Sequence, residues 1–99
     1  MTEVLKNKKK QKISPPSKFE VVLLNDDYST MDFVVEVIRI FFNKDKIASK
    51  KLMLTIHMSG EAVCGVYSFD VANTKVNQVI SYARKNSQPL MCIMRECNK

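Results

Sequence analysis

The chain has 99 residues, 45% of them apolar, which predicts one small domain with a single hydrophobic core. No run of 18 apolar residues occurs and no apolar segment follows the lysine-rich N-terminus. Neither a membrane span nor a signal peptide is therefore expected, and a cytoplasmic location is predicted.

The N-terminal extension over residues 1–18 holds most of the net charge of +6. It contains six lysines and one glutamate, whereas residues 19–99 contain ten basic and nine acidic side chains. The extension has no apolar period and ends near Pro15 and Pro16, so we expect it to be disordered and to precede one domain over 19–99. A lysine run without interleaved arginine or aromatic residues is a weak nucleic-acid signal, and a basic-tailed nucleic-acid-associated domain is kept as the alternative function.

The first predicted element is a strand over 19–25, because FEVVLLN is rich in apolar and β-branched residues. The segment NDDYST then turns the chain. Ser29 with Asp32 fits a capping box, so a helix should begin near Thr30 and end at Asn43. The apolar residues at helical spacing form its expected buried stripe: Phe33, Val34, Val37, Ile38 and Phe41.

Asp45 is the expected N-cap of a second helix over 46–58, and Gly60 is its expected stop. The run EAVCGVYS over 61–68 then predicts a strand.

Asp70 is expected to cap a third helix over 71–85, and LMCIMREC over 90–97 predicts the last strand. The stripe of this helix is expected to contain Val76, Val79, Ile80 and Ala83. The order βααβαβ predicts an α/β protein of the α+β sandwich type, with three helices packed on a three-stranded antiparallel sheet. The strand over 19–25 should be central, because both of its faces are apolar.

The three cysteines, Cys64, Cys92 and Cys97, do not predict a disulfide framework, because their number is odd. A zinc site formed with His57 would lack the usual ligand spacing, and reduced, buried thiols are the preferred interpretation. We predict neither a metal site nor a cofactor.

The side chains of Asn25, Asp26 and Asp27 form a polar cluster at the end of the first strand. Such residues make turns and helix caps, but they also suit the binding of a cation, either a metal ion or an amine. On the second helix, Met53, Ile56 and His57 share one face. His57 is interpreted either as a surface histidine or as a hydrogen-bond acceptor at the edge of an apolar patch.

An enzyme is not expected from these residues. A hydrolase that used Asp26, Asp27 and His57 would lack a nucleophile, and the two glycines of the chain form no phosphate-binding loop. A binding module or an adaptor is therefore the predicted class.

Three segments resemble the ClpS family, adaptors that bring N-degron substrates to a Clp AAA+ unfoldase–protease. They are FEVVLLNDDYSTMDFV over 19–34, LMLTIHMSGEAVCGVY over 52–67 and PLMC over 89–92, together with the pair Thr74–Lys75. The resemblance extends over about residues 15–97. It implies the same α/β fold and an adaptor without catalytic residues, which binds free N-terminal Leu, Phe, Tyr or Trp.

The resemblance also implies the binding residues. Asn25, Asp26 and His57 would accept hydrogen bonds from the α-amino group, while Asp27 and Ser29 would support the loop. The apolar pocket for the first side chain would be formed by Met31, Val34, Met53, Ile56 and Leu90. Met31 stands where the family excludes β-branched side chains, and Thr30 stands, just inside the helix, where the family often has proline.

A second surface is implied for docking on the N-terminal domain of the unfoldase, of the ClpA type or the ClpC type. Its residues would be Tyr67, Asp70, Thr74 and Lys75, with Asp70 standing where glutamate is commoner. The extension over 1–14 would be engaged by the unfoldase during hand-over. The resemblance gives no indication of nucleic-acid or membrane binding.

Overall fold

The computed structural model describes residues 16–97, so most of the predicted disordered extension over 1–18 lies outside the described residues. The elements, in order, are β1 (Phe19–Leu24), α1 (Met31–Phe42), α2 (Lys46–Ser59), β2 (Glu61–Tyr67), α3 (Phe69–Lys85) and β3 (Met91–Glu96). This confirms the predicted βααβαβ order and the α+β class. No helix within residues 16–97 is long and apolar enough to span a bilayer.

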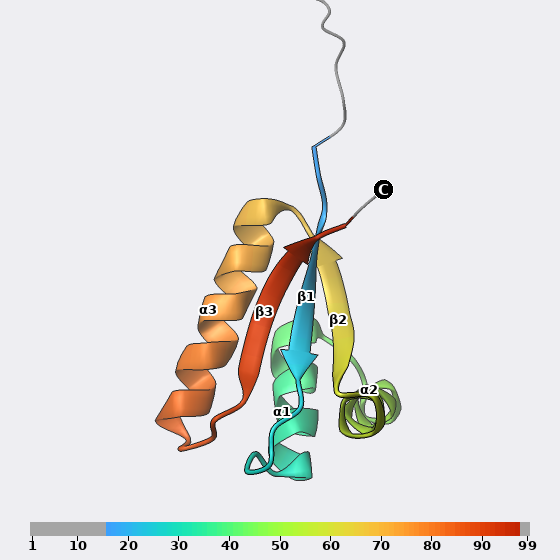
Figure 1. Ribbon diagram of the computed structural model, residues 1–99, viewed down its shortest axis with the longest axis vertical. Helices are drawn as coiled ribbons and strands as arrows, with labels where there is room; N and C mark the ends of the chain where they lie inside the picture. Colours follow the sequence, from blue (N-terminus) through green and yellow to red (C-terminus); the bar gives the residue numbers. More distant parts are fainter. Residues whose placement is uncertain (1–15, 98–99) are drawn as a thin grey trace, which may run out of the picture.

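The sheet is antiparallel with the strand order β2-β1-β3, so the prediction that the first strand is central is confirmed (Figure 1). Val21 pairs with Gly65 on β2 and with Met94 on β3. The register against β2 shifts between Val21 and Val22, which leaves Cys64 as the extra residue of a bulge. The bulge lets β2 place Cys64 in the core while Tyr67, further along the strand, still packs against the core.

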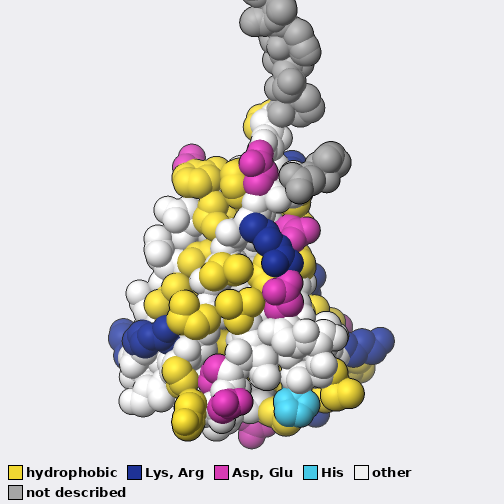
Figure 2. Space-filling view, in the orientation of Figure 1, with side chains coloured by type: hydrophobic (Ala, Val, Ile, Leu, Met, Phe, Trp, Pro, Cys, Tyr) yellow, Lys and Arg dark blue, Asp and Glu magenta, His cyan; other side chains and the backbone are white. Residues whose placement is uncertain are grey.

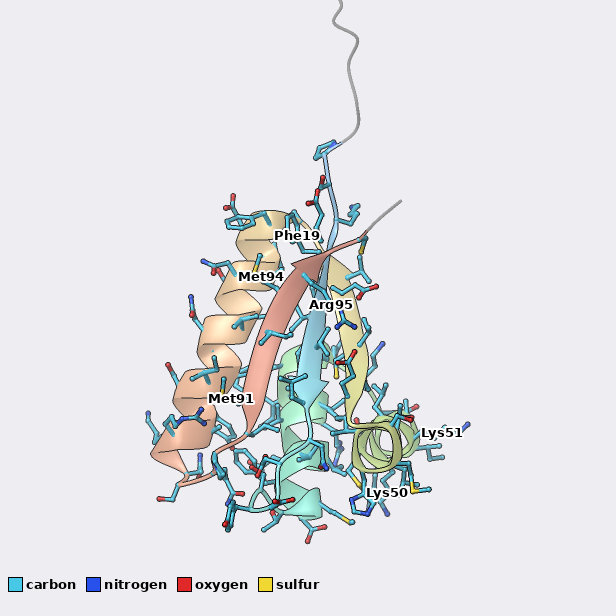
Figure 3. All side chains as sticks on the ribbon, viewed as in Figure 1. Phe19, Lys50, Lys51, Met91, Met94 and Arg95 are labelled. Carbon is cyan, nitrogen blue, oxygen red and sulfur yellow. The ribbon has the colours of Figure 1, made fainter. Side chains whose placement is uncertain are left out.

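The helices cover one face of the sheet, with α1 behind it, α3 along β3 and α2 beside the lower end of β2 (Figure 1). The core lies between the layers and includes Val21 and Leu23 of β1, Val37 of α1 and Val79 of α3, all fully buried. The opposite sheet face carries mixed apolar and charged side chains (Figure 2). On that face Arg95 forms ion pairs with Glu20 and Glu61, at N–O distances of 3.2 and 2.6 Å (Figure 3).

The start of α1 differs by one residue from the capping box that the sequence suggested. Thr30 is the N-cap, because its Oγ1 accepts the N–H of Phe33 at 3.0 Å, and the helix begins at Met31. Ser29 is not the cap, and Thr30 lies outside the helix rather than just inside it. At the other end Phe42 is buried, whereas Phe41 is half-buried. The Phe41 ring packs edge-on against Tyr82, with the ring centroids 5.4 Å apart.

Both predicted ends of α2 are confirmed. The Asp45 carboxylate accepts the N–H of Ala48 at 2.8 Å, and Gly60 ends the helix at φ +93°, where a side chain would be strained.

The predicted cap of α3 is wrong. Ser68 is the N-cap and the helix begins at Phe69, so Asp70 lies in the first turn. Phe69 packs edge-on against Phe19 with the ring centroids 5.3 Å apart, which ties the helix start to the end of the sheet. In the first turn the Asp70 carboxylate still interacts favourably with the helix dipole.

Candidate functional site

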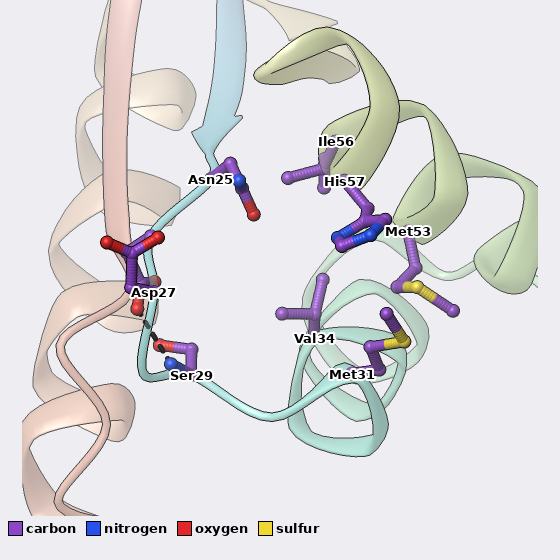
Figure 4. Close-up of a pocket in the computed structure, with 9 residues that line it drawn as sticks. Asn25, Asp27, Ser29, Met31, Val34, Met53, Ile56 and His57 are labelled. Atoms are coloured by element: carbon purple, nitrogen blue, oxygen red, sulfur yellow. Dashed lines mark hydrogen bonds between the residues drawn. The ribbon is translucent and has the colours of Figure 1, made fainter.

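A cavity of about 280 Å³ opens between the loop after β1 and the second helix (Figure 4). Its lining comes from the loop, from the start of α1 and from one face of α2. The nine lining residues are Asn25, Asp26, Asp27, Ser29, Met31, Val34, Met53, Ile56 and His57. The structure thus brings together all but one of the residues that the sequence suggested for the amine site, the loop and the pocket.

One backbone contact explains why residues about 30 positions apart meet here. The N–H of Asn25, at the end of β1, donates to the carbonyl of Gly60, just after α2, at 2.9 Å. The N–H of Gly60 in turn donates to Ile56 O at 2.9 Å, which closes the last turn of the helix. His57 lies in that last turn, so the end of the strand and the imidazole are held at one side of the cavity. Figure 4 shows the Asn25 side chain pointing into the space across which Ile56 and His57 lie.

The resemblance implied that Asp27 and Ser29 support the loop. The side chain that accepts hydrogen bonds there is that of Asp26, and Ser29 takes part through its backbone N–H. One oxygen of Asp26, Oδ1, accepts the N–H groups of Tyr28 and Ser29 at 2.8 and 2.7 Å. This Asx-type turn requires an acceptor two or three residues before the donors, a spacing that Asp26 has. Asp27 is exposed and Ser29 contributes its backbone N–H to the turn.

The environment of Asp26 favours its charged form. Partial burial disfavours the carboxylate, but the backbone N–H groups of Ser29 and Tyr28, the nearby Ser29 hydroxyl and the positive charge of Arg84 outweigh it and hold the pKa of Asp26 below its ordinary value of 3.8. The second oxygen, Oδ2, and the hydroxyl of Ser29 are buried without a hydrogen-bond partner within residues 16–97. The lining of the cavity therefore includes a fixed negative charge.

The rest of the polar rim consists of Asn25, Asp27 and His57, all exposed. Asparagine and neutral histidine can each accept a hydrogen bond, and a carboxylate accepts without donating. No lysine or arginine is among the nine lining residues. The rim is suited to a small cation that carries several hydrogen-bond donors.

Below the rim the cavity is apolar. Val34 and Ile56, exposed by 7% and 2%, join it to the core, while Met31 is 47% exposed and Met53 is half-buried. The side chains of Met31 and Met53 lie next to each other in Figure 4. Flexible thioether side chains can adapt to guests of several shapes. Such a cavity fits one apolar side chain below a polar head group.

Leu90 does not line the cavity. It is 1% exposed and belongs to the hydrophobic core, because it stands just before β3 and turns toward the helices. The resemblance implied that Leu90 forms part of the pocket wall, whereas the structure places it in the core.

The residues expected to dock on an unfoldase lie near the start of α3. Asp70, Thr74 and Lys75 line a shallow hollow on that helix, and Tyr67 is half-buried beside it. Lys75 also has a structural contact that sequence reasoning missed: its Nζ donates to Phe41 O, near the end of α1, at 2.6 Å. The same Nζ lies 5.7 Å from the centre of the Tyr67 ring. A lysine near the C-terminal end of its own helix can be recognised in a sequence, but Lys75 contacts the end of a different helix, α1.

The cysteines are free thiols. Burial raises the pKa of Cys64 and of Cys92 to about 12, which makes both poor nucleophiles and poor metal ligands. Within residues 16–97 no group of three or more His, Cys, Asp and Glu side chains could hold a metal ion.

Comparison with known proteins gives concordant matches. The family model "ATP-dependent Clp protease adaptor protein ClpS" matches residues 14–93. The ClpS adapter protein of Nitrosospira multiformis is 50% identical over 94 residues, which cover 95% of this chain and 92% of that protein. The one of Paraburkholderia phymatum is 48% identical over 89 residues, covering 90% and 86%. Among solved structures, Agrobacterium tumefaciens ClpS2 bound to L-phenylalaninamide matches with a TM-score of 0.82 at 31% identity, covering 84% of this chain and 100% of that chain.

Proposed function

The chain belongs to the ClpS family of adaptors of the ATP-dependent Clp protease, and on this basis we propose that its cavity binds the first residue of substrate proteins whose free N-terminus is Leu, Phe, Tyr or Trp. The adaptor then delivers them to a Clp unfoldase and performs no catalysis itself. The observation that carries this proposal is the polar, cation-accepting rim directly above an apolar cavity.

In this proposal the α-amino group, a cation with three donors, enters the rim. Asn25 and His57 accept hydrogen bonds from it, directly or through water, and Asp26 supplies a fixed negative charge. Asp27, exposed at the same rim, adds a second carboxylate. An acetylated terminus has lost the positive charge and two of its donors. Binding it would leave desolvated acceptors unpaired, which is costly.

The first side chain fills the cavity. Burying an aromatic side chain removes about 150–250 Å² from water, a gross gain of roughly 4–6 kcal/mol. The entropy cost of association consumes much of this, so the affinity should be modest. Met31, near the mouth, would meet a methyl group on Cβ, so Val and Ile are excluded while Leu and the aromatic residues pass. A related adaptor, A. tumefaciens ClpS2, was solved with L-phenylalaninamide, which combines a free amino group with an aromatic side chain.

For delivery, the exposed part of α3 around Asp70 and Thr74 docks on the N-terminal domain of a ClpA-type or ClpC-type unfoldase. This surface belongs to a different element from the cavity, so one adaptor can contact substrate and unfoldase together.

Fluorescence anisotropy with labelled peptides tests the proposal. Peptides that begin with Phe or Leu should bind, whereas the acetylated Phe peptide and those that begin with Val or Ile should bind at least tenfold more weakly. Met31→Ala should admit the Val and Ile peptides, and Met58→Ala, which removes an exposed methionine outside the cavity lining, is the matched control. Equal binding of all peptides by the unmodified protein would refute the proposal.

A further inference from the structure

We propose that Gln88 is a positioning residue for the binding loop, an inference that rests on the function proposed above. Its side-chain oxygen Oε1 accepts the backbone N–H of Thr30 at 3.1 Å, across a sequence separation of 58 residues. Gln88 lies between α3 and β3 and does not line the cavity. It therefore acts on the site only through the loop.

The Thr30 N–H is bonded from outside the loop, by the Gln88 side chain. Asp26 already accepts the N–H groups of Tyr28 and Ser29, which fixes the first part of the loop from within. Thr30 follows as the N-cap of α1, and the N–H of an N-cap residue lies before the helical hydrogen-bond ladder. The bond from Gln88 thus holds the one residue between the Asp26 turn and Met31.

Gln88 is itself held in place on both sides. Its N–H donates to Ala83 O at 2.8 Å, after a turn in which Ser87 has a positive φ of 58°. Its carbonyl accepts from Arg84 Nη1 at 2.9 Å, and the same Nη1 donates to Leu90 O at 2.9 Å. Gln88 therefore presents its carboxamide from a backbone that is fixed at both its N–H and its C=O, so only the side-chain torsions lose freedom when Oε1 bonds Thr30.

The consequence for binding is geometric. Met31 directly follows Thr30, and Val34 is one turn further along α1, so both cavity walls depend on where the helix begins. Without the Gln88 bond the loop would open more often, and the acceptors and Met31 would spend less time in the binding arrangement. A hydrogen bond of ordinary net strength changes such an opening equilibrium about two- to tenfold.

Amide hydrogen exchange measured by NMR on the peptide-free protein tests the hydrogen bond between Gln88 and Thr30 directly. In Gln88→Leu the Thr30 amide should exchange about two- to tenfold faster, while the Phe33 amide, bonded to Thr30 Oγ1, should change less. Gln88→Glu keeps an acceptor and should restore most of the protection. Asn86→Ala is the matched control, because Asn86 Nδ2 bonds Tyr82 O in the same turn and leaves the Gln88 carboxamide intact.

Peptide binding tests the positioning role. Gln88→Leu should weaken the binding of a Phe peptide by a similar factor, with Gln88→Glu and Asn86→Ala close to the unmodified protein. Unchanged Thr30 exchange, or faster exchange with unchanged affinity, would overturn the inference. Failure of the unmodified protein to bind any of the peptides would instead refute the proposed function. The exchange data would still decide whether the bond from Gln88 protects the Thr30 amide.

Discussion

Replacing Lys75 by methionine removes an ammonium group while keeping an unbranched side chain of similar length. In the folded protein this ammonium donates to Phe41 O at 2.6 Å in a half-buried position near the C-terminal end of α1. Hydrogen bonds to charged groups contribute about 1.5–3 kcal/mol, and partial exposure to water reduces this, so we expect a loss of about 1–2 kcal/mol. For a domain of this size the midpoint of thermal unfolding should fall by about 5–15 °C.

Thermal and urea unfolding, followed by far-ultraviolet circular dichroism, measure this loss. Lys50→Met is the matched control, because Lys50 is exposed on α2. The control should change the free energy of unfolding by less than about 0.5 kcal/mol. If Lys75→Met were as stable as the control, the contact with α1 would contribute nothing to the free energy of unfolding. Any loss of unfoldase binding would then come from Lys75 as a docking residue alone.

Thr30→Ala should destabilise the protein by about 1 kcal/mol in urea unfolding, while Thr30→Ser, which keeps the capping oxygen, should stay near the unmodified protein. Because the folded state lowers the pKa of Asp26 below 3.8, its stabilising contribution is complete above that pH and is lost as the pH falls through the lower folded value. The difference in unfolding free energy between the unmodified protein and Asp26→Asn should therefore shrink from pH 6 to pH 3, and a constant difference would contradict this. A thiol reagent at pH 8 should modify Cys97 first. Cys64 and Cys92, which are buried and have pKa values of about 12, should stay unreactive until the protein is unfolded. Mass spectrometry of the labelled peptides counts the modified sites.

Much of the fold could be predicted from local signals. The run FEVVLL is mostly apolar on both faces, a pattern that suits the central strand it forms. One face packs toward the helices and the other lies under the ion pairs of Arg95. Asp45 and Gly60 delimit α2 because each satisfies backbone groups that any helix end leaves unpaired. Most residues that line the cavity could also be predicted, but only through the resemblance to a family, since a lone histidine or a pair of methionines is ambiguous by itself.

Two of the errors occur where neighbouring residues are locally equivalent. Ser29 and Thr30 are both good caps, and Asp26 and Asp27 are both good turn residues, so the sequence determined only that a turn and a capped helix lie here. The tertiary structure decided between them by fixing which N–H lies within reach of which oxygen. Contacts between distant segments, such as Lys75 with Phe41 and Gln88 with Thr30, leave no periodic pattern in the chain, because they depend on how the packed helices bring remote backbone groups together.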